Sequence, residues 1–342
     1  MKALCVVAKN RLEFRELPEP HFGAYDALVR VLSCGICNST DWKILEGEFV
    51  SGTFPTAIGH ESVGEVVKVG TKVKSFAVGD LVLRPKLRDE HVPVPGGRSR
   101  WGGFSEYGVV TDAWAEKGEP YNAFPHPQQI VPASIGVAEA VAFITLKEVF
   151  SCLLRTEIEP GQSLAIVGTG PVAQGLVMWA GLVGVGSVVV FGRRAELSKR
   201  FLALGAEAYV AGNDMPPQVR KVLQNGGFDR AIEAVGARAA LTRCLQVTRS
   251  SGRVNLYGLA PESEPYLADE EKDPRVFRSR VVEAEVHDRA LEHVAAGRVR
   301  LADWYSDVMP WEDFKKGFDL VHRRLANKVV LNIVSNRSAQ PA

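Results

Sequence analysis

Two cysteines and a Gly-His-Glu sequence in the first third of the chain have the residue types of a metal site. Cys34 and Cys37 are two residues apart, and His60 and Glu61 follow further along. A thiolate and a neutral imidazole are natural ligands of a catalytic zinc ion that keeps one coordination position open. A Cys-x-x-Cys pair is also found in redox sites and zinc knuckles, but no thioredoxin-like βαβ pattern surrounds this one and the second half of a knuckle is missing. We interpret Cys37 and His60, with Glu61 beside them, as a candidate zinc site; the alternative is a buried thiol and a core histidine.

A glycine-rich loop near the middle of the chain has the residues of a dinucleotide-binding turn. Gly168, Gly170 and Ala173 fill a G-x-G-x-x-G/A pattern, with Pro171 and Val172 inside it. The first glycine permits a tight turn, the second lets the backbone approach a pyrophosphate, and alanine is tolerated for helix packing. The residues before the loop predict a buried strand, and those after it predict a helix whose free N–H groups would hold the diphosphate. The alternative is a structural glycine-rich turn.

The end of the next predicted strand indicates which nucleotide binds. NAD enzymes usually carry Asp or Glu there, which accepts a hydrogen bond from the ribose 2′-hydroxyl. This strand ends instead in Gly192, Arg193 and Arg194. A glycine leaves room for a 2′-phosphate, and guanidinium groups match its geometry. The sequence therefore predicts NADP(H); the alternative is that the two arginines begin an ordinary solvated helix.

The patterns around these residues predict two architectures. The first third has short alternating runs between turn residues, which is typical of a mostly β domain. Beyond residue 132 strand-like and helical runs alternate, which indicates an open parallel sheet with helices on both faces. The predicted strands of this sheet are 164–167, 188–191, 208–210, 230–233 and 253–257, and the helices between them include 195–204, 218–224 and 238–248.

The predicted fold class is α/β, with a β-rich catalytic domain and a doubly wound, Rossmann-type nucleotide-binding domain. We place the catalytic domain at residues 1–135, the nucleotide-binding domain at 136–274, and a return to the catalytic domain at 275–342. The last segment contains two predicted helices and a final strand at 328–334, but no phosphate loop. We therefore expect it to pack on the N-terminal domain.

Composition narrows the class of function. The 342 residues are 46% hydrophobic and carry a formal net charge of +1, which argues against a disordered chain and against electrostatic binding to nucleic acid or an anionic membrane. Residues 163–192 carry no charge and exceed the roughly 20 residues of a membrane span, but glycines and Pro171 interrupt them as in two buried strands and a crossover helix. Five scattered cysteines fit a reducing compartment. We expect a cytoplasmic protein that acts on a small molecule.

The ordered set of motifs resembles the zinc-dependent medium-chain alcohol and polyol dehydrogenase family over essentially the whole chain. The motifs are a cysteine followed by hydroxyl residues, Gly-His-Glu, the Gly-x-Gly-x-x-Ala loop and a closing Lys-Val-Val-Leu strand. The resemblance implies that both ends of the chain form a GroES-like catalytic domain. It also implies that the protein assembles as a homodimer or homotetramer. It also implies that Cys37 and His60 bind zinc, that Glu61 lies beside the metal and can coordinate it, and that Ser39 bonds the substrate oxygen and begins a proton relay.

Three features depart from that family's pattern. The third metal ligand of the family falls on Ile144, which cannot bind zinc, so the metal would rest on the three residues above with water, would recruit Glu148, or would be absent. The four-cysteine lobe of many relatives is missing from residues 84–100, so no structural zinc is expected. The aspartate that usually stands three residues after the ligand cysteine is one residue later here, at Asp41, and we expect it to orient His60 from this position.

The function expected from these residues and this resemblance is NADP(H)-dependent interconversion of a secondary alcohol and a ketone by zinc-assisted hydride transfer. A polyol, a sugar or a cyclitol is the expected substrate class. Lys147 and Glu148 lie where the family's helix faces the nicotinamide, so they are candidates to hold a polar substrate or to act as acid and base; the alternative is an exposed helix face. Two other functions stay open, a metal-free NADPH-dependent reductase of the same fold and a non-catalytic nucleotide-binding protein.

Overall fold

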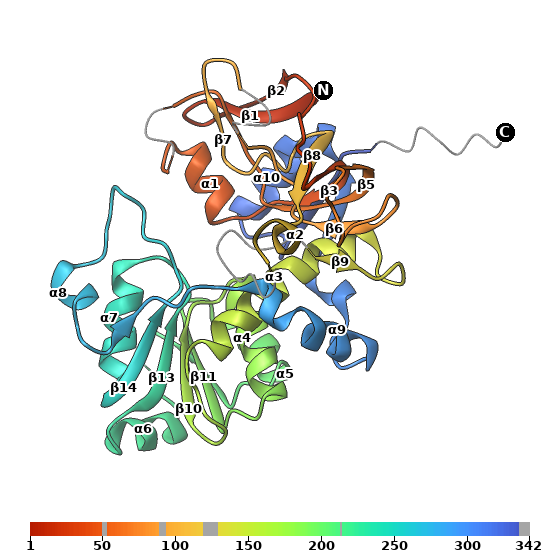
Figure 1. Cartoon of the computed structure of the whole chain (residues 1–342). Helices are drawn as coiled ribbons and strands as arrows, with labels where there is room; N and C mark the ends of the chain where they lie inside the picture. Colours follow the sequence, from red (N-terminus) through yellow and green to blue (C-terminus); the bar gives the residue numbers. More distant parts are fainter. Residues whose placement is uncertain (50–52, 89–93, 119–128, 213, 335–342) are drawn as a thin grey trace. The chain divides into compact units, whose positions relative to one another are not determined.

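The computed structural model describes residues 1–49, 53–88, 94–118, 129–212 and 214–334. The chain forms two compact units (Figure 1), of which unit 1 contains Met1–Thr145 and His287–Ala342 and unit 2 contains Leu146–Val286. Both divisions fall further along the chain than the predicted boundaries at 135 and 274. At the first division this is because one helix, α3 (Val137–Leu154), contributes residues to both units.

Unit 1 is built on two sheets of mostly short strands, which agrees with the predicted β-rich domain. One sheet has the strand order β2-β1-β4-β7, and the other has the order β16-β17-β3-β5-β6-β9 with β8 paired to β3. The strands are β1 (Lys2–Ala8), β2 (Arg11–Glu16), β3 (Asp26–Gly35), β4 (Thr56–Ala57), β5 (Glu61–Val69), β6 (Leu81–Leu83), β7 (Arg98–Ser99), β8 (Tyr107–Thr111), β9 (Ile130–Val131), β16 (Asp307–Pro310) and β17 (Val329–Asn332).

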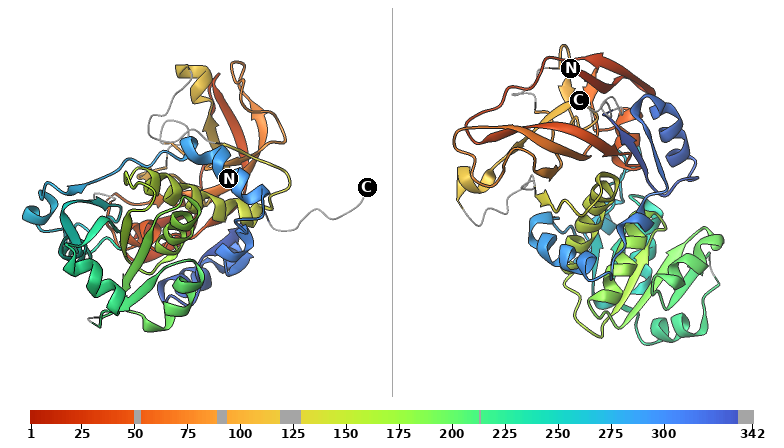
Figure 2. Two further views of the ribbon diagram at one scale, coloured as in Figure 1. Left: turned by 90° about the horizontal axis from the view of Figure 1, so that it is seen from below. Right: turned by 90° about the vertical axis from the view of Figure 1, so that its right-hand side faces the viewer.

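The pairing of β3 with its two neighbours determines what lies near the candidate metal site. β3 is antiparallel to β5 with Gly35 opposite Glu61, so the loop that follows β3 lies beside the start of β5. On its other edge β3 pairs with β17, which places Leu331 opposite Cys34. The C-terminal segment, drawn in blue in Figure 2, is therefore part of unit 1, as its lack of a phosphate loop led us to expect.

Short helices complete unit 1 and share one core with the strands. They are α1 (Thr40–Leu45), α2 (Ala113–Lys117), α9 (His287–Ala295), the 3-10 turns η3 (Leu301–Trp304) and η4 (Trp311–Asp313), and α10 (Phe314–His322). Buried side chains from both ends of the chain form one cluster, with Leu4 from β1, Val31 from β3, Ile44 from α1, Phe318 from α10 and Leu331 from β17. Removal of apolar surface from water holds α1 and α10 against this sheet.

Unit 2 contains the predicted doubly wound sheet. Its strand order is β12-β11-β10-β13-β14-β15 with parallel pairing throughout, so the order reverses between β10 and β13. In such sheets ligands bind at the carboxyl ends of the strands beside this reversal. The strands are β10 (Ser163–Val167), β11 (Ser187–Gly192), β12 (Ala208–Ala211), β13 (Phe228–Glu233), β14 (Thr248–Leu256) and β15 (Val276–Phe277).

Crossover helices cover this sheet, with α4 against β10 and β11 and α7 against β10, β13 and β14. The helical elements of unit 2 are α4 (Pro171–Leu182), η1 (Ala195–Leu197), α5 (Ser198–Ala203), α6 (Pro217–Gln224), α7 (Arg238–Val247), α8 (Ala268–Glu271) and η2 (Glu283–Val286). The predicted helix at 195–204 therefore begins as a 3-10 turn. The uncharged stretch at 163–192 consists of β10, α4 and β11, and no helix in the described part of the chain is long and apolar enough to span a membrane.

Candidate functional site

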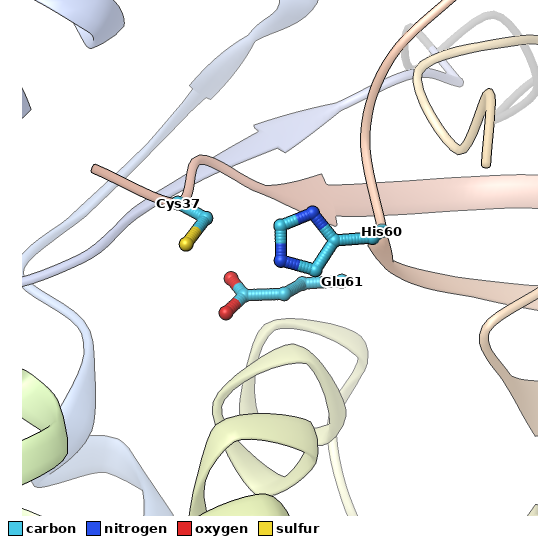
Figure 3. A group of neighbouring side chains, drawn as sticks. All are labelled: Cys37, His60 and Glu61. Carbon is cyan, nitrogen blue, oxygen red and sulfur yellow. The ribbon is translucent and has the colours of Figure 1, made fainter. Parts of the chain in front are cut away.

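The predicted metal ligands converge in unit 1. Donor atoms of Cys37, His60 and Glu61 all lie within 4.8 Å of one another (Figure 3), and no other group of three such donors is found among the described residues. Cys37 lies in the loop between β3 and α1, His60 immediately precedes β5, and Glu61 is the first residue of β5. The antiparallel pairing of β3 with β5 therefore brings together residues that are separated in the sequence.

Asp41 orients two of these residues from the first turn of α1. Its Oδ2 accepts a hydrogen bond from the N–H of Cys37 at 2.9 Å, and its Oδ1 lies 3.3 Å from Nδ1 of His60. The contact leaves Nε2 of His60 as the nitrogen that can face a metal. Burial opposes a charged imidazole, but the Asp41 carboxylate and the Cys37 sulfur outweigh it and raise the pKa of His60 well above its ordinary value. Asp41 thus contacts His60 despite its shifted place in the sequence.

Glu61 has a partner on each carboxylate oxygen. The hydroxyl of Thr145 donates to Oε1 at 2.9 Å, and the ammonium of Lys328 donates to Oε2. All three side chains are buried. Burial alone would raise the pKa of Glu61, but Lys328 and His60 outweigh it and lower that pKa to about 2. Burial disfavours the charge on Lys328 as well, but Glu61 raises the pKa of this lysine.

Lys328 and Thr145 are not among the site residues predicted from the sequence. Lys328 precedes the apolar residues of β17, and its contact with Glu61 spans 267 residues of sequence. Lysine is seldom fully buried unless it has a partner. A lysine at the start of an apolar closing strand is therefore the signal that could have indicated a buried acid nearby.

Ile144 supplies no donor at the position of the family's third ligand. It is fully buried on α3, next to the residue that bonds Glu61. Glu148, the predicted substitute, is half-buried on the same helix and belongs to unit 2. Cys34 is fully buried, and burial raises the pKa of its thiol, which argues against a redox couple with Cys37.

The other predicted catalytic residues lie in different environments. Ser39 is exposed at the N-terminal boundary of α1, and its side chain makes no capping hydrogen bond with the helix. Lys147 is fully buried in unit 2, where its Nζ lies 3.8 Å from Oε2 of the buried Glu283. Of the predicted pair Lys147 and Glu148, only Glu148 is partly accessible.

The predicted glycine loop connects β10 to α4 in unit 2. Gly168 has a φ of +142° and is fully buried beside the backbone of Ala234, which lies 3.0 Å from where a Cβ would stand. Gly170 is the N-cap of α4, Pro171 is the first helical residue, and a Cβ at Gly170 would meet no atom within 4 Å. The backbone at the start of α4 is thus accessible at the point where a diphosphate would bind.

Arg194 lies across this loop. Its Nη2 donates to the carbonyl and hydroxyl oxygens of Thr169, both at 2.9 Å, and its own carbonyl accepts a hydrogen bond from the Tyr209 hydroxyl at 2.7 Å. Arg193 is exposed. The glycine at 192 is required by close packing, because a Cβ there would lie 2.2 Å from Thr169 Cγ2 and 2.4 Å from Tyr209 Oη. The space on this side of Gly192, which we expected to be open, is therefore filled by Thr169 and Tyr209.

Comparison with known proteins gives the class of protein. The alcohol dehydrogenase GroES-like domain family matches residues 23–119, and the zinc-binding dehydrogenase family matches residues 171–296. Sorbitol dehydrogenase of Bacillus subtilis is 28% identical, with 87% of each chain covered. NADP-dependent isopropanol dehydrogenase of Clostridium beijerinckii is 28% identical, covering 75% of this chain and 77% of the relative.

A solved structure agrees with these matches. Alcohol dehydrogenase TADH from Thermus sp. ATN1 is similar with a TM-score of 0.77 and 26% identity, covering 97% of this chain and 99% of that one. The chain belongs to the medium-chain dehydrogenase family, with a GroES-like domain and a Rossmann-type domain. It is an oxidoreductase related to alcohol and polyol dehydrogenases, which act on CH–OH groups of small molecules.

Proposed function

We propose that the protein is an NADP(H)-dependent dehydrogenase that interconverts a secondary alcohol of the polyol, sugar or cyclitol class with its ketone, with the help of one bound zinc ion. The observation that carries this proposal is the convergence of Cys37, His60 and Glu61 in unit 1. The relatives that support an alcohol substrate are named for sorbitol and isopropanol.

The donor set fits a catalytic zinc ion. A thiol, an imidazole and a carboxylate are all common zinc ligands, and three protein ligands leave one position for substrate or water. Asp41 fixes His60 so that Nε2 is the free nitrogen, as is usual for a metal-bound histidine. Each oxygen of Glu61 keeps a second lone pair beyond its bond to Thr145 or Lys328. When bound, zinc would supply Lewis acidity that polarises an alcohol or carbonyl oxygen.

The chain's own residues have separate tasks in this proposal. Ser39, whose hydroxyl is not used to cap α1, bonds the substrate oxygen and carries its proton toward solvent. Asp41 holds the ring of His60, and Lys328 keeps Glu61 ionised. A Ser39→Ala variant should therefore lower kcat with little change in metal content, and an unchanged kcat would remove this role.

The choice of NADP(H) over NAD(H) rests on the arginines after β11. Arg194 is fixed by Thr169 above the glycine loop, and Arg193 is exposed beside it. Guanidinium groups bind phosphate through paired, charge-assisted hydrogen bonds. In contrast, the described structure has no acid at the end of β11 to hold a ribose 2′-hydroxyl.

The predicted assembly, location and domain limits belong to the same proposal. We propose a cytoplasmic homodimer or homotetramer whose catalytic domain comprises residues 1–135 and 275–342 and whose NADP-binding domain comprises 136–274, with no structural zinc. Sedimentation velocity at micromolar concentration measures the assembly, and a monomer alone would contradict it.

The decisive experiment measures zinc per chain in protein purified without chelators. We expect about one zinc per chain in the wild type and almost none in Cys37→Ala. A Cys244→Ala variant is the matched control. Cys244 is a fully buried cysteine in unit 2 and is not a proposed zinc ligand, so this variant should keep the zinc. Zinc that is lost from Cys37→Ala, together with oxidation of polyols by NADP⁺, supports the proposal.

A metal-free reductase of the same fold is the second candidate. Ile144 cannot replace the missing ligand, and Glu61 already has partners on both oxygens. If purified protein holds no metal but binds NADPH, the acid must come from a side chain. Glu148 is then the residue to replace first, because Lys147 lies against Glu283.

A further inference from the structure

One buried residue joins two loops at the carboxyl edge of the sheet in unit 2. Glu233, the last residue of β13, is fully buried, and its Oε1 accepts the N–H groups of Val235 and Gly236, both at 2.9 Å. Its backbone carbonyl accepts the N–H groups of Tyr257 and Gly258 at 3.1 and 2.9 Å. Glu233 therefore fixes both the loop that follows β13 and the loop that follows β14.

Tyr266 reaches the same carboxylate from a third segment. It lies two residues before α8, and its hydroxyl donates to Oε2 of Glu233 at 2.7 Å and lies 3.0 Å from the carbonyl oxygen of Gly258. Arg278 donates through Nη1 to that carbonyl and to the carbonyl of Leu256, both at 3.0 Å. A buried carboxylate oxygen without a donor is costly, so the Tyr266 hydroxyl stabilises this arrangement.

The two loops are packed too closely to move independently. A Cβ at Gly258 would lie 2.1 Å from the backbone nitrogen of Gly236. A Cβ at Gly236, whose φ is +79°, would lie 2.3 Å from the carbonyl oxygen of Leu259. On the other side, the carbonyl oxygen of Ala234 lies 3.0 Å from the Cβ position of Gly168. The loops held by Glu233 thus border the glycine turn at the start of α4.

The strand order indicates which half of a dinucleotide these loops receive. A doubly wound sheet binds a dinucleotide across the point where the strand order reverses, with one nucleoside on each side. The arginines proposed to bind the adenosine 2′-phosphate follow β11, on one side of β10, and β13 and β14 lie on the other side. The nicotinamide half therefore falls over the loops after β13 and β14. Val235 and Leu259, one in each loop, are both 47% exposed and accessible to a ligand.

We infer that the hydrogen bond between Tyr266 and Glu233 positions the nicotinamide half of the cofactor, because it holds the two loops in the form that receives this group. Both side chains are buried, so they act through the loops and not by contact with the cofactor. They are positioning residues. This inference rests on the proposed function for the identity of the cofactor as NADP(H).

The test compares ligands that contain the nicotinamide nucleoside with one that lacks it. Calorimetry measures the binding of NADPH, NADH and 2′,5′-ADP to the wild type and to Tyr266→Phe, which loses the hydroxyl and keeps the ring. We expect the affinities for NADPH and NADH to fall by a similar factor, about three- to tenfold, and the affinity for 2′,5′-ADP to change by less than about twofold. Glu233→Gln, in which an amide nitrogen replaces one acceptor oxygen, should show the same pattern.

Thr242→Val is the matched control. The Thr242 hydroxyl donates to Oε1 of Glu270 at 2.7 Å, so it ties α7 to α8 through the same kind of hydrogen bond. This variant should keep its affinity for all three ligands. Equal losses for NADPH and 2′,5′-ADP in Tyr266→Phe would indicate a general role in folding and overturn the inference, as would unchanged binding of all three ligands.

The same titrations separate this inference from the proposed function, because they need no turnover. A wild type that binds NADH more tightly than NADPH would contradict the proposed cofactor, but a matching loss of both affinities in Tyr266→Phe would still sustain the positioning role. Tight NADPH binding that is equal in the wild type and Tyr266→Phe would sustain the cofactor and overturn the positioning role. Binding of neither dinucleotide would contradict both.

Discussion

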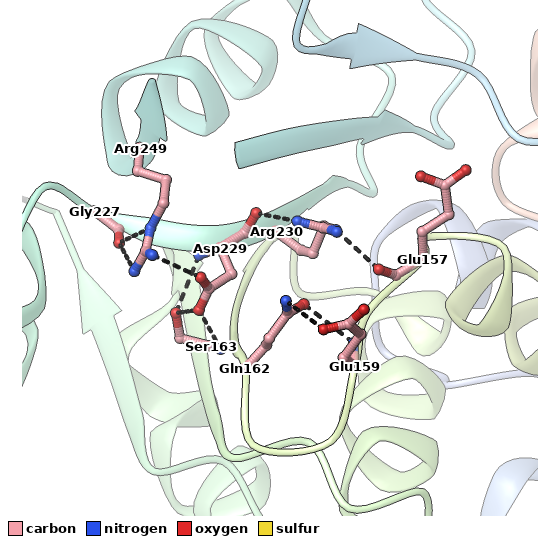
Figure 4. Close-up of polar contacts among 8 residues, drawn as sticks. All are labelled: Glu157, Glu159, Gln162, Ser163, Gly227, Asp229, Arg230 and Arg249. Atoms are coloured by element: carbon pink, nitrogen blue, oxygen red, sulfur yellow. Dashed lines mark hydrogen bonds and ion pairs between the residues drawn. The ribbon is translucent and has the colours of Figure 1, made fainter. Parts of the chain in front are cut away.

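The two edges of the parallel sheet in unit 2 use polar residues in different ways. At the amino edge, Asp229 accepts hydrogen bonds from the N–H and hydroxyl of Ser163 at 2.8 and 2.7 Å and lies 2.9 Å from Arg249 (Figure 4). Arg249 also donates to the carbonyl of Gly227. Burial raises the pKa of Asp229, but its hydrogen bonds to Ser163 and the charge of Arg249 outweigh it and leave the pKa below its ordinary value. These groups bind one another across the starts of β10, β13 and β14.

The carboxyl edge is organised around backbone groups. Glu233, the last residue of β13, accepts the N–H groups of Val235 and Gly236 at 2.9 Å and the hydroxyl of Tyr266 at 2.7 Å. Here burial outweighs the hydrogen bonds and raises the pKa of Glu233. Beside it, the Cβ position of Gly170 is open space at the start of α4.

The difference follows from the direction of the strands. Helix N-termini and the chain reversal between β10 and β13 occur at the carboxyl edge, so that edge can receive a diphosphate. At the amino edge, the charged groups of Asp229 and Arg249 bind each other and join the strands. Changes at the carboxyl edge should therefore affect cofactor binding, and changes at the amino edge should affect stability.

Replacing both Arg193 and Arg194 by Ala should have the largest effect. Loss of two guanidinium groups from a 2′-phosphate should weaken NADPH binding by about 100-fold or more, because each charge-assisted bond contributes about 1.5–3 kcal/mol. NADH binding should change only a few-fold, and the midpoint of thermal unfolding should stay within a few degrees. Fluorescence titration with both nucleotides measures this; equal losses for NADPH and NADH would remove the assignment.

Asp229→Ala should produce the reverse pattern. It leaves the N–H of Ser163 and one side of Arg249 without their acceptor, so we expect the free energy of unfolding to fall by about 2 kcal/mol. NADPH affinity should remain within twofold of the wild type. Asp214→Ala is the control, because Asp214 is almost fully exposed and should change neither quantity. A loss of NADPH affinity in Asp229→Ala would show that the two edges are coupled.

The pH dependence of unfolding should distinguish the edges by sign. The folded-state pKa of Asp229 is lowered, so its contribution is present above the unfolded value of 3.8 and is lost as the pH falls. The folded-state pKa of Glu233 is raised, so its ionisation costs stability as the pH rises above 4.5. Relative to the wild type, Asp229→Asn should lose stability at neutral pH, and Glu233→Gln should reduce the fall in the free energy of unfolding as the pH rises above 4.5. Denaturant titrations from pH 3 to 8 measure the free energy of unfolding of both variants relative to the wild type. If this difference changed with pH in the same direction for Asp229→Asn and Glu233→Gln, the assignment would be contradicted.

Local patterns predicted the nucleotide-binding sheet well. β10 and β11 are continuous apolar runs, and each begins one residue before its predicted start. Their burial on both faces and the glycine turn between β10 and α4 are properties of neighbouring residues. The start of β14 at Thr248 was missed, since its first residues include serines and a glycine and no apolar pattern distinguishes them.

The contacts of the metal site could be predicted only in part. Cys37, His60 and Glu61 have recognisable types and spacing, but the partners of Glu61 come from α3 and from the residue before β17. Strand β4 has only two residues and exists because β1 and β7 pair with it, which no local propensity indicates. Contacts of this kind depend on tertiary packing rather than on neighbouring residues.

Tyr209→Phe should have the smallest measurable effect at the carboxyl edge. The Tyr209 hydroxyl donates to the carbonyl of Arg194, so we expect it to act on NADPH binding by positioning that arginine. Loss of one neutral hydrogen bond at about 0.5–1 kcal/mol should weaken NADPH binding by about two- to fivefold and leave NADH binding unchanged. In Arg194→Ala the further change Tyr209→Phe should have no effect on NADPH affinity, and Tyr305→Phe in unit 1 is the control. Equal weakening of NADPH by Tyr209→Phe with and without Arg194 would show that Tyr209 acts on the fold of this edge rather than on the arginine.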